Sequence, residues 1–373
     1  MPRTIAFYAP LKPPGHPIPS GDREIARNLV KALRLAGYRV IIPTEAISYQ
    51  KRPSAALFAE RKALCEAEAS RLMDDWSRQP GEAPDLWFTY HPYCKSPDWI
   101  GPPVARALNI PYVTAEACRT RQATDADWAE ARAAVQAAVR QAAVNFCLKP
   151  SDRAYLASFL PDMKTVAPLA PFIDEADLTR TPPLPRGDTV PVILAVGMMR
   201  PGAKIESYRL LAEALAGLEH LDWRLVVVGD GPERAVVEAM FAFAGSRNTF
   251  TGALAREEVT ARMASADLFA WPGVREAFGM VYLEAQAAGL PVVAFDTAGV
   301  PIVVTDGTGG LLAPEGDLEA YRGHLARLLA SPGERRRLGD AARREVADRH
   351  GLTAAAATLD AALRPLFVTE RSA

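Results

Sequence analysis

Short apolar runs alternate with longer segments of helical periodicity along most of this chain, and this alternation restricts its fold more than any other feature. Strands of a parallel sheet are covered on both faces, so they read as nearly continuous stretches of Val, Ile, Leu and Phe. A helix between two such strands supplies the crossover that parallel pairing needs. The sequence therefore predicts an α/β protein made of βαβ units and parallel sheets.

In the first half of the chain, the segments that read as strands are Thr4–Tyr8, Tyr38–Ile42, Leu86–Tyr90, Pro111–Thr114 and Val144–Leu148. The helical segments there are about Asp22–Ala36, Ala55–Trp76 and Trp128–Ala143. The second half predicts strands at Val192–Val196, Trp223–Val228, Thr249–Thr251, Leu268–Ala270, Val292–Phe295 and Gly310–Leu312. Its predicted helices are about Glu206–Leu218, Glu233–Phe243, Arg256–Ser265 and Met280–Ala288.

Proline is concentrated between the two halves, where it indicates a connector because it lacks the N–H that a sheet needs and restricts the preceding residue. We predict two doubly wound, Rossmann-like domains. Ligands of such sheets bind beyond the carboxyl ends of the strands, so two facing domains would share a central cleft. The expected boundaries are residues 1–175 for the first domain, 176–190 for a linker, 191–350 for the second domain and 351–373 for a terminal helix that packs back on the first.

Composition excludes several classes of protein. The chain has 373 residues with 43 Lys and Arg against 44 Asp and Glu, and so a formal net charge of −1. Nucleic-acid binders usually carry a basic excess, so we expect no nucleic-acid partner. Without a run of about 18 apolar residues, and with Met1–Pro10 reading as a strand rather than a leader, the chain is expected to be cytoplasmic. Its four widely spaced cysteines read as reduced thiols.

The sequence predicts neither a bound metal nor a resident cofactor. Asp125 and Asp127 match a metal-binding D-x-D pattern by their letters, but they precede an Ala-rich helix and are better explained as an N-cap. The histidines are scattered, and the glycine-rich motifs that bind NAD or the phosphates of a P-loop are missing from the sequence.

The most informative segment runs from Trp271 to Val293. It follows a predicted strand, turns, and enters a helix near Phe278. The unpaired N–H groups of a helix start suit an anion such as a phosphate, and Gly279 would let a ligand approach the backbone. Glu276 precedes this helix and Glu284 lies within it. Two carboxylates beside an anion need other partners, and sugar hydroxyls are good ones.

The pattern Glu-x-Phe-Gly, followed by Glu-Ala-x-Ala-x-Gly-x-Pro-Val-Val, resembles the glutamate–seven–glutamate signature of the family 4 glycosyltransferases of the GT-B fold. The resemblance covers roughly residues 190–350 and extends to the first half only in outline. It implies that the second domain binds a nucleotide-diphosphate sugar and that the first binds an acceptor. It also implies that transfer retains the anomeric configuration without a metal.

The resemblance implies roles for individual residues. Glu276 would bind hydroxyls of the donor sugar, Glu284 the ribose, and the backbone of Phe278, Gly279 and Met280 the sugar and the diphosphate. The base would be read by variable loops around Leu254, Gly229 and Gly231. For the two glutamates, the structural alternative is a solvated helix charge.

Cations are expected beside the diphosphate, because negative charge develops on this leaving group. The family usually places an Arg directly after the glycine that ends the first strand of the domain, with a Lys a few residues on. Here Arg200 stands two positions late after Gly197, and Lys204 is followed by Ile205 where a glycine is usual. We expect Lys204 and Arg200 at the diphosphate; the alternative is that both are surface charges.

The first domain offers weaker candidates. Gly21 opens a helix where the family often has paired glycines, and a plain N-cap by Ser20 is the alternative. His91, after the strand Leu86–Tyr90, resembles the family histidine near the donor sugar, although a lone histidine is more often structural. Glu116 ends the next strand and would face the same edge of the sheet.

Basic residues follow one face of the first helix, at Arg23, Arg27 and Lys31, with Arg34 beyond them. Such a stripe would allow a peripheral contact with an anionic membrane or with a lipid-linked acceptor. A solvated helix face is the more common meaning.

The function predicted from the sequence is retaining transfer of a sugar from a nucleotide-diphosphate sugar to an unidentified glycan, lipid or small-molecule acceptor. Front-face displacement is the expected mechanism. The expected role is cell-envelope or polysaccharide biosynthesis in the cytoplasm or at the inner face of the membrane. Two alternatives stay open: a catalytically degenerate GT-B protein that binds nucleotide or glycan, and a nucleotide-sugar epimerase or a phosphorylase on the same scaffold.

Overall fold

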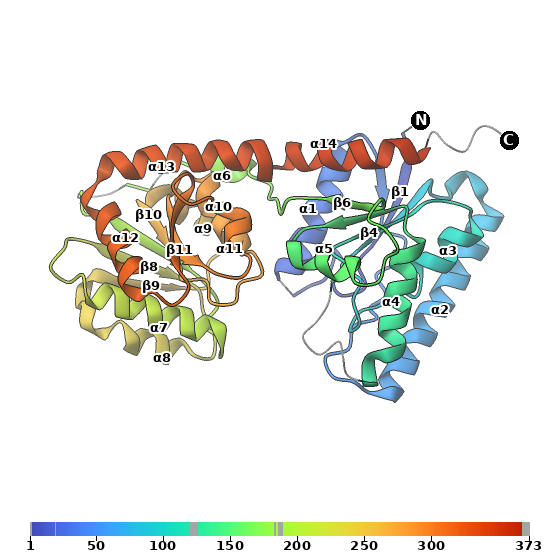
Figure 1. Ribbon diagram of the computed structural model, residues 1–373, viewed down its shortest axis with the longest axis horizontal. Helices are drawn as coiled ribbons and strands as arrows, with labels where there is room; N and C mark the ends of the chain where they lie inside the picture. Colours follow the sequence, from blue (N-terminus) through green and yellow to red (C-terminus); the bar gives the residue numbers. More distant parts are fainter. Residues whose placement is uncertain (1, 19, 119–125, 183, 186–188, 368–373) are drawn as a thin grey trace. The chain divides into compact units, whose positions relative to one another are not determined.

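The computed structural model describes residues 2–18, 20–118, 126–182, 184–185 and 189–367. It divides into two compact units, one of Met1–Ala170 with Leu352–Ala373 and one of Pro171–Gly351. Each unit contains its own six-stranded sheet flanked by helices (Figure 1), and every pairing between neighbouring strands is parallel. The predicted α/β class with parallel sheets is confirmed.

The sheet of the first unit has the order β2-β1-β3-β4-β5-β6. Its strands are β1 (Thr4–Tyr8), β2 (Arg39–Ile41), β3 (Leu86–Tyr90), β4 (Tyr112–Ala115), β5 (Val144–Cys147) and β6 (Val166–Pro168). Its helices are α1 (Gly21–Leu35), α2 (Ala55–Arg78), α3 (Gly101–Ala107), α4 (Ala129–Gln141), α5 (Pro150–Ala157) and α14 (Leu352–Leu363). Short 3₁₀ segments lie at Pro80–Glu82, Ala126–Trp128 and Arg364–Phe367.

The sheet of the second unit has the order β12-β11-β10-β7-β8-β9. Its strands are β7 (Val192–Val196), β8 (Arg224–Val228), β9 (Asn248–Gly252), β10 (Leu268–Ala270), β11 (Val292–Asp296) and β12 (Gly310–Pro314). Its helices are α6 (Ala176–Arg180), α7 (Ala203–Ala216), α8 (Arg234–Met240), α9 (Arg256–Ser265), α10 (Met280–Ala287), α11 (Val300–Val303), α12 (Leu318–Ala330) and α13 (Pro332–Glu345). A 3₁₀ segment (Ala242–Arg247) and a π-helical turn (Val346–His350) complete this unit.

Each sheet is wound in both directions from an inner strand. In the first unit β1 lies between β2 and β3, and in the second β7 lies between β8 and β10. Loops that leave such a pair of strands at their carboxyl ends diverge and leave a crevice, which is where ligands of doubly wound sheets bind. The fold therefore points to the ends of β1 and β3 in one unit and of β7 and β10 in the other.

Burial explains why the strands read as continuous apolar runs. Every residue of β1, β3, β4 and β5 is buried, as expected for strands covered on both faces. Aromatic side chains fill much of the space between the first sheet and its helices. Trp87 packs edge-on against Tyr8 and Trp76, with ring centroids 6.1 and 6.5 Å away.

Several elements escaped prediction, and proline accounts for most of them. The edge strand β6 is short and ends at Pro168, in agreement with the preference of proline for sheet edges. Prolines also stand in the first turns of α3 and α5, where a missing N–H costs nothing. The expected linker 176–190 contains the helix α6, which belongs to the second unit. The boundaries between the units fall after Ala170 and Gly351.

Helix α14 returns the end of the chain to the first unit, where it packs on α1. Leu359 and Leu363 on its inner face are fully buried. Tyr38 donates a hydrogen bond to Asp360 Oδ1 at 2.8 Å. Burial and this hydrogen bond raise the pKa of the Tyr38 phenol. The last described helix is therefore an integral part of the first unit.

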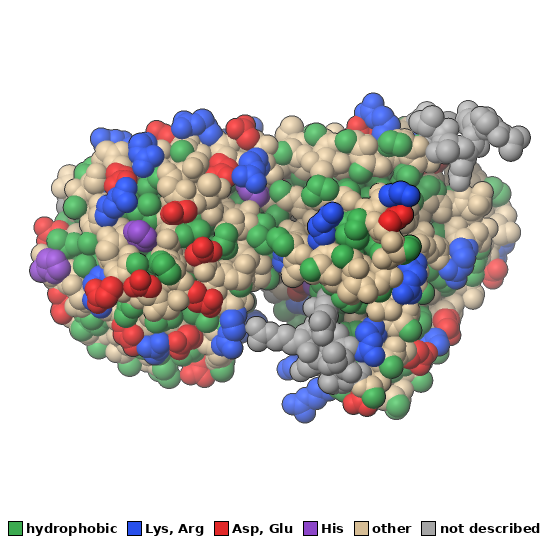
Figure 2. All heavy atoms as spheres, in the orientation of Figure 1, with side chains coloured by type: hydrophobic (Ala, Val, Ile, Leu, Met, Phe, Trp, Pro, Cys, Tyr) green, Lys and Arg blue, Asp and Glu red, His purple; other side chains and the backbone are tan. Residues whose placement is uncertain are grey.

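The surface carries charges of both signs. Figure 2 shows Lys and Arg interspersed with Asp and Glu over the face that it presents. Within the described ranges, no helix combines the length and the apolar character that crossing a bilayer would require. All four cysteines are free, as predicted, and Cys118 differs from the others in being partly exposed.

We expect Leu359→Ala to lower the free energy of unfolding of the first unit by about 2–5 kcal/mol, because it opens a cavity in a close-packed interface. Urea denaturation followed by fluorescence measures this change. Thr358→Ala, on the exposed side of the same helix, is the matched control and should change stability by less than about 0.5 kcal/mol. Equal effects of the two substitutions would show that α14 does not stabilise the unit.

Candidate functional site

The loop between β10 and α10, residues 271–279, is fixed from several sides. Tyr282 donates a hydrogen bond to the carbonyl of Trp271 at 3.0 Å. The N–H of Val274 donates to Ser207 Oγ on α7 at 3.1 Å. The N–H of Gly299 donates to the carbonyl of Glu276 at 3.1 Å. The loop that carries the predicted glutamate is therefore held by α7, α10 and the start of α11.

The structure brings Lys204 and Glu276 into direct contact. Lys204, in the first turn of α7, donates from Nζ to Glu276 Oε1. The same ammonium lies 5.3 Å from the centroid of the Trp271 ring, and Trp271 Nε1 donates to the same carboxylate oxygen at 3.4 Å. Both charged side chains are partly exposed. A cation and a carboxylate thus meet at the carboxyl ends of β7 and β10.

Helix α10 begins at Met280 with Gly279 as its N-cap, in agreement with the predicted helix at about Met280–Ala288. Gly279 has a φ of 70°, and a Cβ there would lie 2.7 Å from the Tyr282 ring. Phe278 is buried, so it can offer a ligand only its backbone. Glu284 is partly buried within α10. The structure therefore places the predicted residues at and within one helix start.

Close packing against a neighbouring backbone explains why positions 229 and 231 are glycines. A Cβ on Gly229 would lie 2.0 Å from the carbonyl oxygen of Gly197, and one on Gly231 would lie 2.2 Å from that of Met199. The turn after β8 thus packs directly against the loop after β7. Arg200, in that second loop, is exposed, and Leu254 is partly buried before α9. Contact of these positions with a nucleotide stays a prediction.

Left-handed backbone at non-glycine residues marks strand ends in both units. His91 and Glu116, with φ of 58° and 56°, directly follow β3 and β4. Arg275, with φ of 56°, and Ala298, with φ of 49°, stand after β10 and β11. This conformation costs an L-residue about 1–2 kcal/mol, and such strain tends to gather at functional sites.

His91 lies at the junction of β3 with the start of α1. Its Nδ1 is 3.4 Å from Asp22 Oδ1, its Nε2 is 3.4 Å from Cys118 Sγ, and its ring stacks on Tyr93 at 4.8 Å. Burial alone would lower the pKa of His91. The charge of Glu116, together with the contacts of the ring with the Cys118 sulfur and the Asp22 carboxylate, outweighs burial and raises the pKa well above its usual value.

A buried ionic cluster lies beside His91, and sequence reasoning missed most of it. Lys149 Nζ donates to Glu116 Oε1 at 2.6 Å and lies 3.8 Å from Asp152 Oδ1. Tyr90 donates to Glu116 Oε2 at 3.0 Å. Burial raises the pKa of Asp152 to about 6, although the Lys149 charge opposes this rise. The available signal was position, since Lys149 follows β5 at the same sheet edge as His91 and Glu116.

Ser20 is the N-cap of α1, as the alternative interpretation of this segment predicted. Ser20 Oγ accepts from the N–H of Arg23 at 3.3 Å. Gly21 is exposed, and a Cβ there would meet nothing within 4 Å. The fold therefore does not require a glycine at this position.

Members of the basic stripe have structural partners: Arg34 Nη2 donates to the carbonyl of Val40 at 3.4 Å, and two other arginines hold a loop. Arg27 Nε donates to the carbonyl of Pro14 at 2.8 Å. Arg23 Nη1 donates to the carbonyl of His16 at 3.1 Å. These arginines hold the proline-rich loop after β1 against α1. A membrane contact through the stripe stays a prediction.

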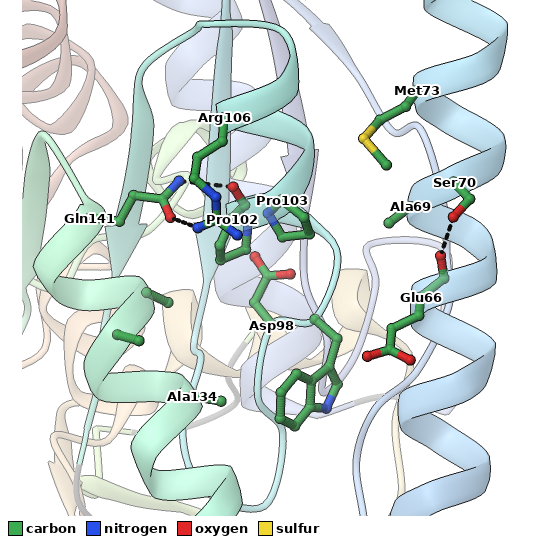
Figure 3. Close-up of a pocket in the computed structure, with 13 residues that line it drawn as sticks. Glu66, Ala69, Ser70, Met73, Asp98, Pro102, Pro103, Arg106, Ala134 and Gln141 are labelled. Carbon is green, nitrogen blue, oxygen red and sulfur yellow. Dashed lines mark hydrogen bonds between the residues drawn. The ribbon is translucent and has the colours of Figure 1, made fainter.

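A pocket of about 410 Å³ opens between α2, α3 and α4 of the first unit (Figure 3). Ala, Pro and Met side chains form most of its wall, and Arg106 donates to Gln141 at one side. Asp98 contributes to the wall, but its carboxylate already accepts hydrogen bonds from Thr89, Tyr112 and the start of α3. The predicted site residues do not line this pocket.

A metal site does not emerge from the part of the chain that the structure describes, where no three His, Cys, Asp or Glu side chains are grouped to hold an ion. Asp125 lies outside the described residues. Asp127 lies in the 3₁₀ turn before α4, whose N-cap is Trp128, so Asp127 does not cap α4. Independence from metals and cofactors stays a prediction.

Comparison with known proteins finds a family match within the second unit. Residues 190–331 match the model of the family described as glycosyl transferases group 1. The second unit is therefore similar to this family of glycosyltransferases over residues 190–331. The 2-deoxystreptamine glucosyltransferase of Streptomyces kanamyceticus is 36% identical over 146 residues, which are 38% of this chain and 37% of that protein. The match to this curated relative thus spans little more than a third of its length.

Solved structures of GT-B proteins have a similar fold over nearly the whole of this chain. Sucrose-phosphate synthase from Thermosynechococcus elongatus is 20% identical, with a TM-score of 0.73 over 99% of this chain and 100% of that one. HepE of Anabaena, solved in complex with UDP and glucose, is 14% identical, with a TM-score of 0.66 over 97% of this chain and 100% of that one. At these identities the likeness shows the fold, and the predicted GT-B architecture is confirmed.

The Asp152 carboxyl gives a test of the buried cluster. Its pKa of about 6 exceeds the ordinary 3.8, so the folded state binds this proton more tightly and the carboxyl destabilises the fold as pH rises from about 4 to 6. As the pH rises from 4 to 7, the free energy of unfolding of the wild type should therefore fall by about 3 kcal/mol relative to that of Asp152→Asn, which has no carboxyl to ionise. Denaturant unfolding at both pH values measures this change. Parallel pH dependences of the two proteins would contradict the buried, proton-binding carboxyl.

Proposed function

We propose that this GT-B protein transfers a sugar from a nucleotide-diphosphate sugar to a hydroxyl-bearing acceptor, with the donor bound at the carboxyl ends of β7 and β10. The observation that carries the proposal is the contact between Lys204 and Glu276 beside the start of α10. A carboxylate suits sugar hydroxyls, whereas an ammonium and a helix start suit a diphosphate. All three lie at the switch point where doubly wound sheets bind ligands.

The donor pose follows from the chemistry of these groups. Glu276 binds hydroxyls of the sugar, and Glu284, further along α10, binds the ribose. The backbone of residues 278–280 faces the sugar and the diphosphate. Lys204, with the exposed Arg200 in the neighbouring loop, stabilises negative charge on the leaving diphosphate. Such preorganised charges act where charge develops in the transition state.

We propose that transfer retains the anomeric configuration by front-face displacement. The bond from the acceptor oxygen to the anomeric carbon forms on the face from which the diphosphate oxygen departs. The acceptor proton passes to that departing oxygen. Neither a covalent enzyme intermediate nor a metal takes part in this proposal, and Lys204 with the start of α10 supplies the positive charge.

In the first unit, His91 and the open helix start at Gly21 are proposed as substrate-binding positions. Both lie at the carboxyl edge of the first sheet, beside the switch point between β1 and β3. The acceptor is a glycan, a lipid or a small molecule. The printed name of the curated relative does not select among these, because its match covers only 38% of this chain.

The proposal predicts that one donor among UDP-, GDP- and ADP-sugars is turned over, with release of the nucleoside diphosphate. Glu276→Gln should lower kcat/KM about 10- to 100-fold, because it replaces a charge-assisted hydrogen bond by a neutral one. Release of the nucleoside diphosphate in a coupled assay measures both effects. Glu257→Gln, at an exposed position of α9, is the control and should behave as the wild type.

The outcomes of this assay separate the competing functions. Turnover that requires inorganic phosphate would indicate a phosphorylase, and a changed sugar without an acceptor would indicate an epimerase. Nucleotide binding without any turnover would indicate a degenerate GT-B protein. Wild-type rates in Glu276→Gln would contradict the role assigned to this glutamate.

A further inference from the structure

Trp271 directly follows β10, where the chain enters the loop 271–279, and its side chain is fully buried. Its backbone N–H donates to the carbonyl of Val293 on β11 at 3.0 Å. Its own carbonyl accepts the hydrogen bond from Tyr282 on α10 at 3.0 Å. The backbone of Trp271 is therefore fixed by the neighbouring strand and by the helix of the candidate site.

The indole ring of Trp271 is fixed as well. It packs edge-on against the Tyr208 ring of α7, with the ring centroids 4.8 Å apart and 79° between the ring planes. Tyr208 in turn donates to the carbonyl of Gly197 at 2.7 Å. A Cβ on Gly197 would lie 3.1 Å from the indole, so the glycine that follows β7 leaves room for this ring. Such close packing permits the ring little movement.

This one side chain contacts both charges of the candidate site. The indole Nε1–H of Trp271 donates to Glu276 Oε1 at 3.4 Å, and a buried indole N–H needs such an acceptor. The Lys204 ammonium lies over the ring, 5.3 Å from its centroid, which is within the range where the face of an aromatic ring attracts a cation. The edge of the indole therefore holds the carboxylate, and its face holds the ammonium.

We propose that Trp271 is a positioning residue of the donor site, which holds the Glu276 carboxylate through its N–H and the Lys204 ammonium over its ring. Both contacts are present in the structure without a ligand. The consequence for sugar transfer rests on the proposed function, because the donor is what would separate the two charges.

The indole contacts matter most when a ligand parts Lys204 from Glu276. Within the described ranges, the side-chain hydrogen bonds of Glu276 both fall on Oε1, which leaves Oε2 for sugar hydroxyls. A diphosphate that draws the ammonium away takes an ion-pair partner from the carboxylate. The carboxylate then keeps the indole N–H and the ammonium keeps the ring face. Charged groups that are held in place before the reaction stabilise the transition state without further reorganisation.

The first test follows the indole N–H signal of Trp271 by NMR in the full chain with isotope-labelled tryptophan. The chain has six tryptophans, and the Trp271 signal is the one that disappears in Trp271→Phe. Glu276→Gln replaces a charged acceptor by a neutral one, so the Trp271 signal should move upfield while the others stay in place. Glu257→Gln, at an exposed position of α9, is the control and should move none of them.

An unchanged Trp271 signal in folded Glu276→Gln would overturn the inference. If circular dichroism shows that Trp271→Phe is unfolded, the signal is assigned by elimination from Trp→Phe variants at the other positions. The same criterion then applies to it.

The second test compares two buried tryptophans in the transfer assay. Trp223 stands just before β8, at the opposite end of the strands from the candidate site, and donates from Nε1 to the carbonyl of Leu218 at 2.8 Å. Trp271→Phe keeps an aromatic face but removes the N–H, so kcat/KM for the donor should fall about 10-fold. Trp223→Phe also loses one buried hydrogen bond and should stay within about twofold of the wild type.

Coupling to the carboxylate separates positioning from a merely structural role. In the Glu276→Gln background, adding Trp271→Phe should lower kcat/KM much less than it does in the wild type, because the charged acceptor is already gone. A wild-type kcat/KM in folded Trp271→Phe, or an equal loss in both backgrounds, would overturn the inference. If no donor is turned over although the Trp271 signal responds to Glu276→Gln, the proposed function fails and the positioning of Glu276 by Trp271 stands.

Discussion

The outward winding of each sheet from an inner strand is the constraint on which both candidate sites depend. Parallel strands deliver all their carboxyl ends to one edge, and the divergence of the loops at β1/β3 and at β7/β10 leaves that edge open. The sequence separation of Lys204 and Glu276 is 72 residues, yet they meet because one follows β7 and the other β10. In the first unit the same topology collects His91, Glu116 and Lys149. Both units therefore place ionisable side chains where a ligand can reach the sheet.

The two clusters differ in how their charges are compensated. Lys204 and Glu276 form a partly exposed pair; under the proposed function, a donor would replace one partner with its diphosphate and the other with its sugar hydroxyls. Glu116 is buried and its partner Lys149 is partly buried, and breaking this pair would leave an uncompensated buried carboxylate. The first pair is suited to exchanging partners with a ligand, whereas the second is suited to a fixed arrangement.

Sequence reasoning recovered much of this fold because the strands are buried on both faces and the motif of the second unit is local. The strands of the second unit were all predicted, and Glu276, Glu284 and Gly279 were found from one continuous segment. What it missed depends on tertiary position. β6 is short and ends in proline, and α3 and α5 begin with prolines that look like breaks. Lys149 and Asp152 look like an ordinary helix start, and only the sheet order shows that they lie beside Glu116.

The most direct test of the account is binding of nucleoside diphosphates and their sugars to the full chain, followed by thermal unfolding of the wild type and of Glu284→Ala in parallel. A ligand at about 100 times its Kd adds about 2.7 kcal/mol of stability, which raises the unfolding midpoint. The account predicts a rise with the nucleotides of one base in the wild type, and loss of that rise in Glu284→Ala. No rise with the uracil, guanine or adenine nucleotides, or an equal rise in both proteins, would contradict a donor site on α10.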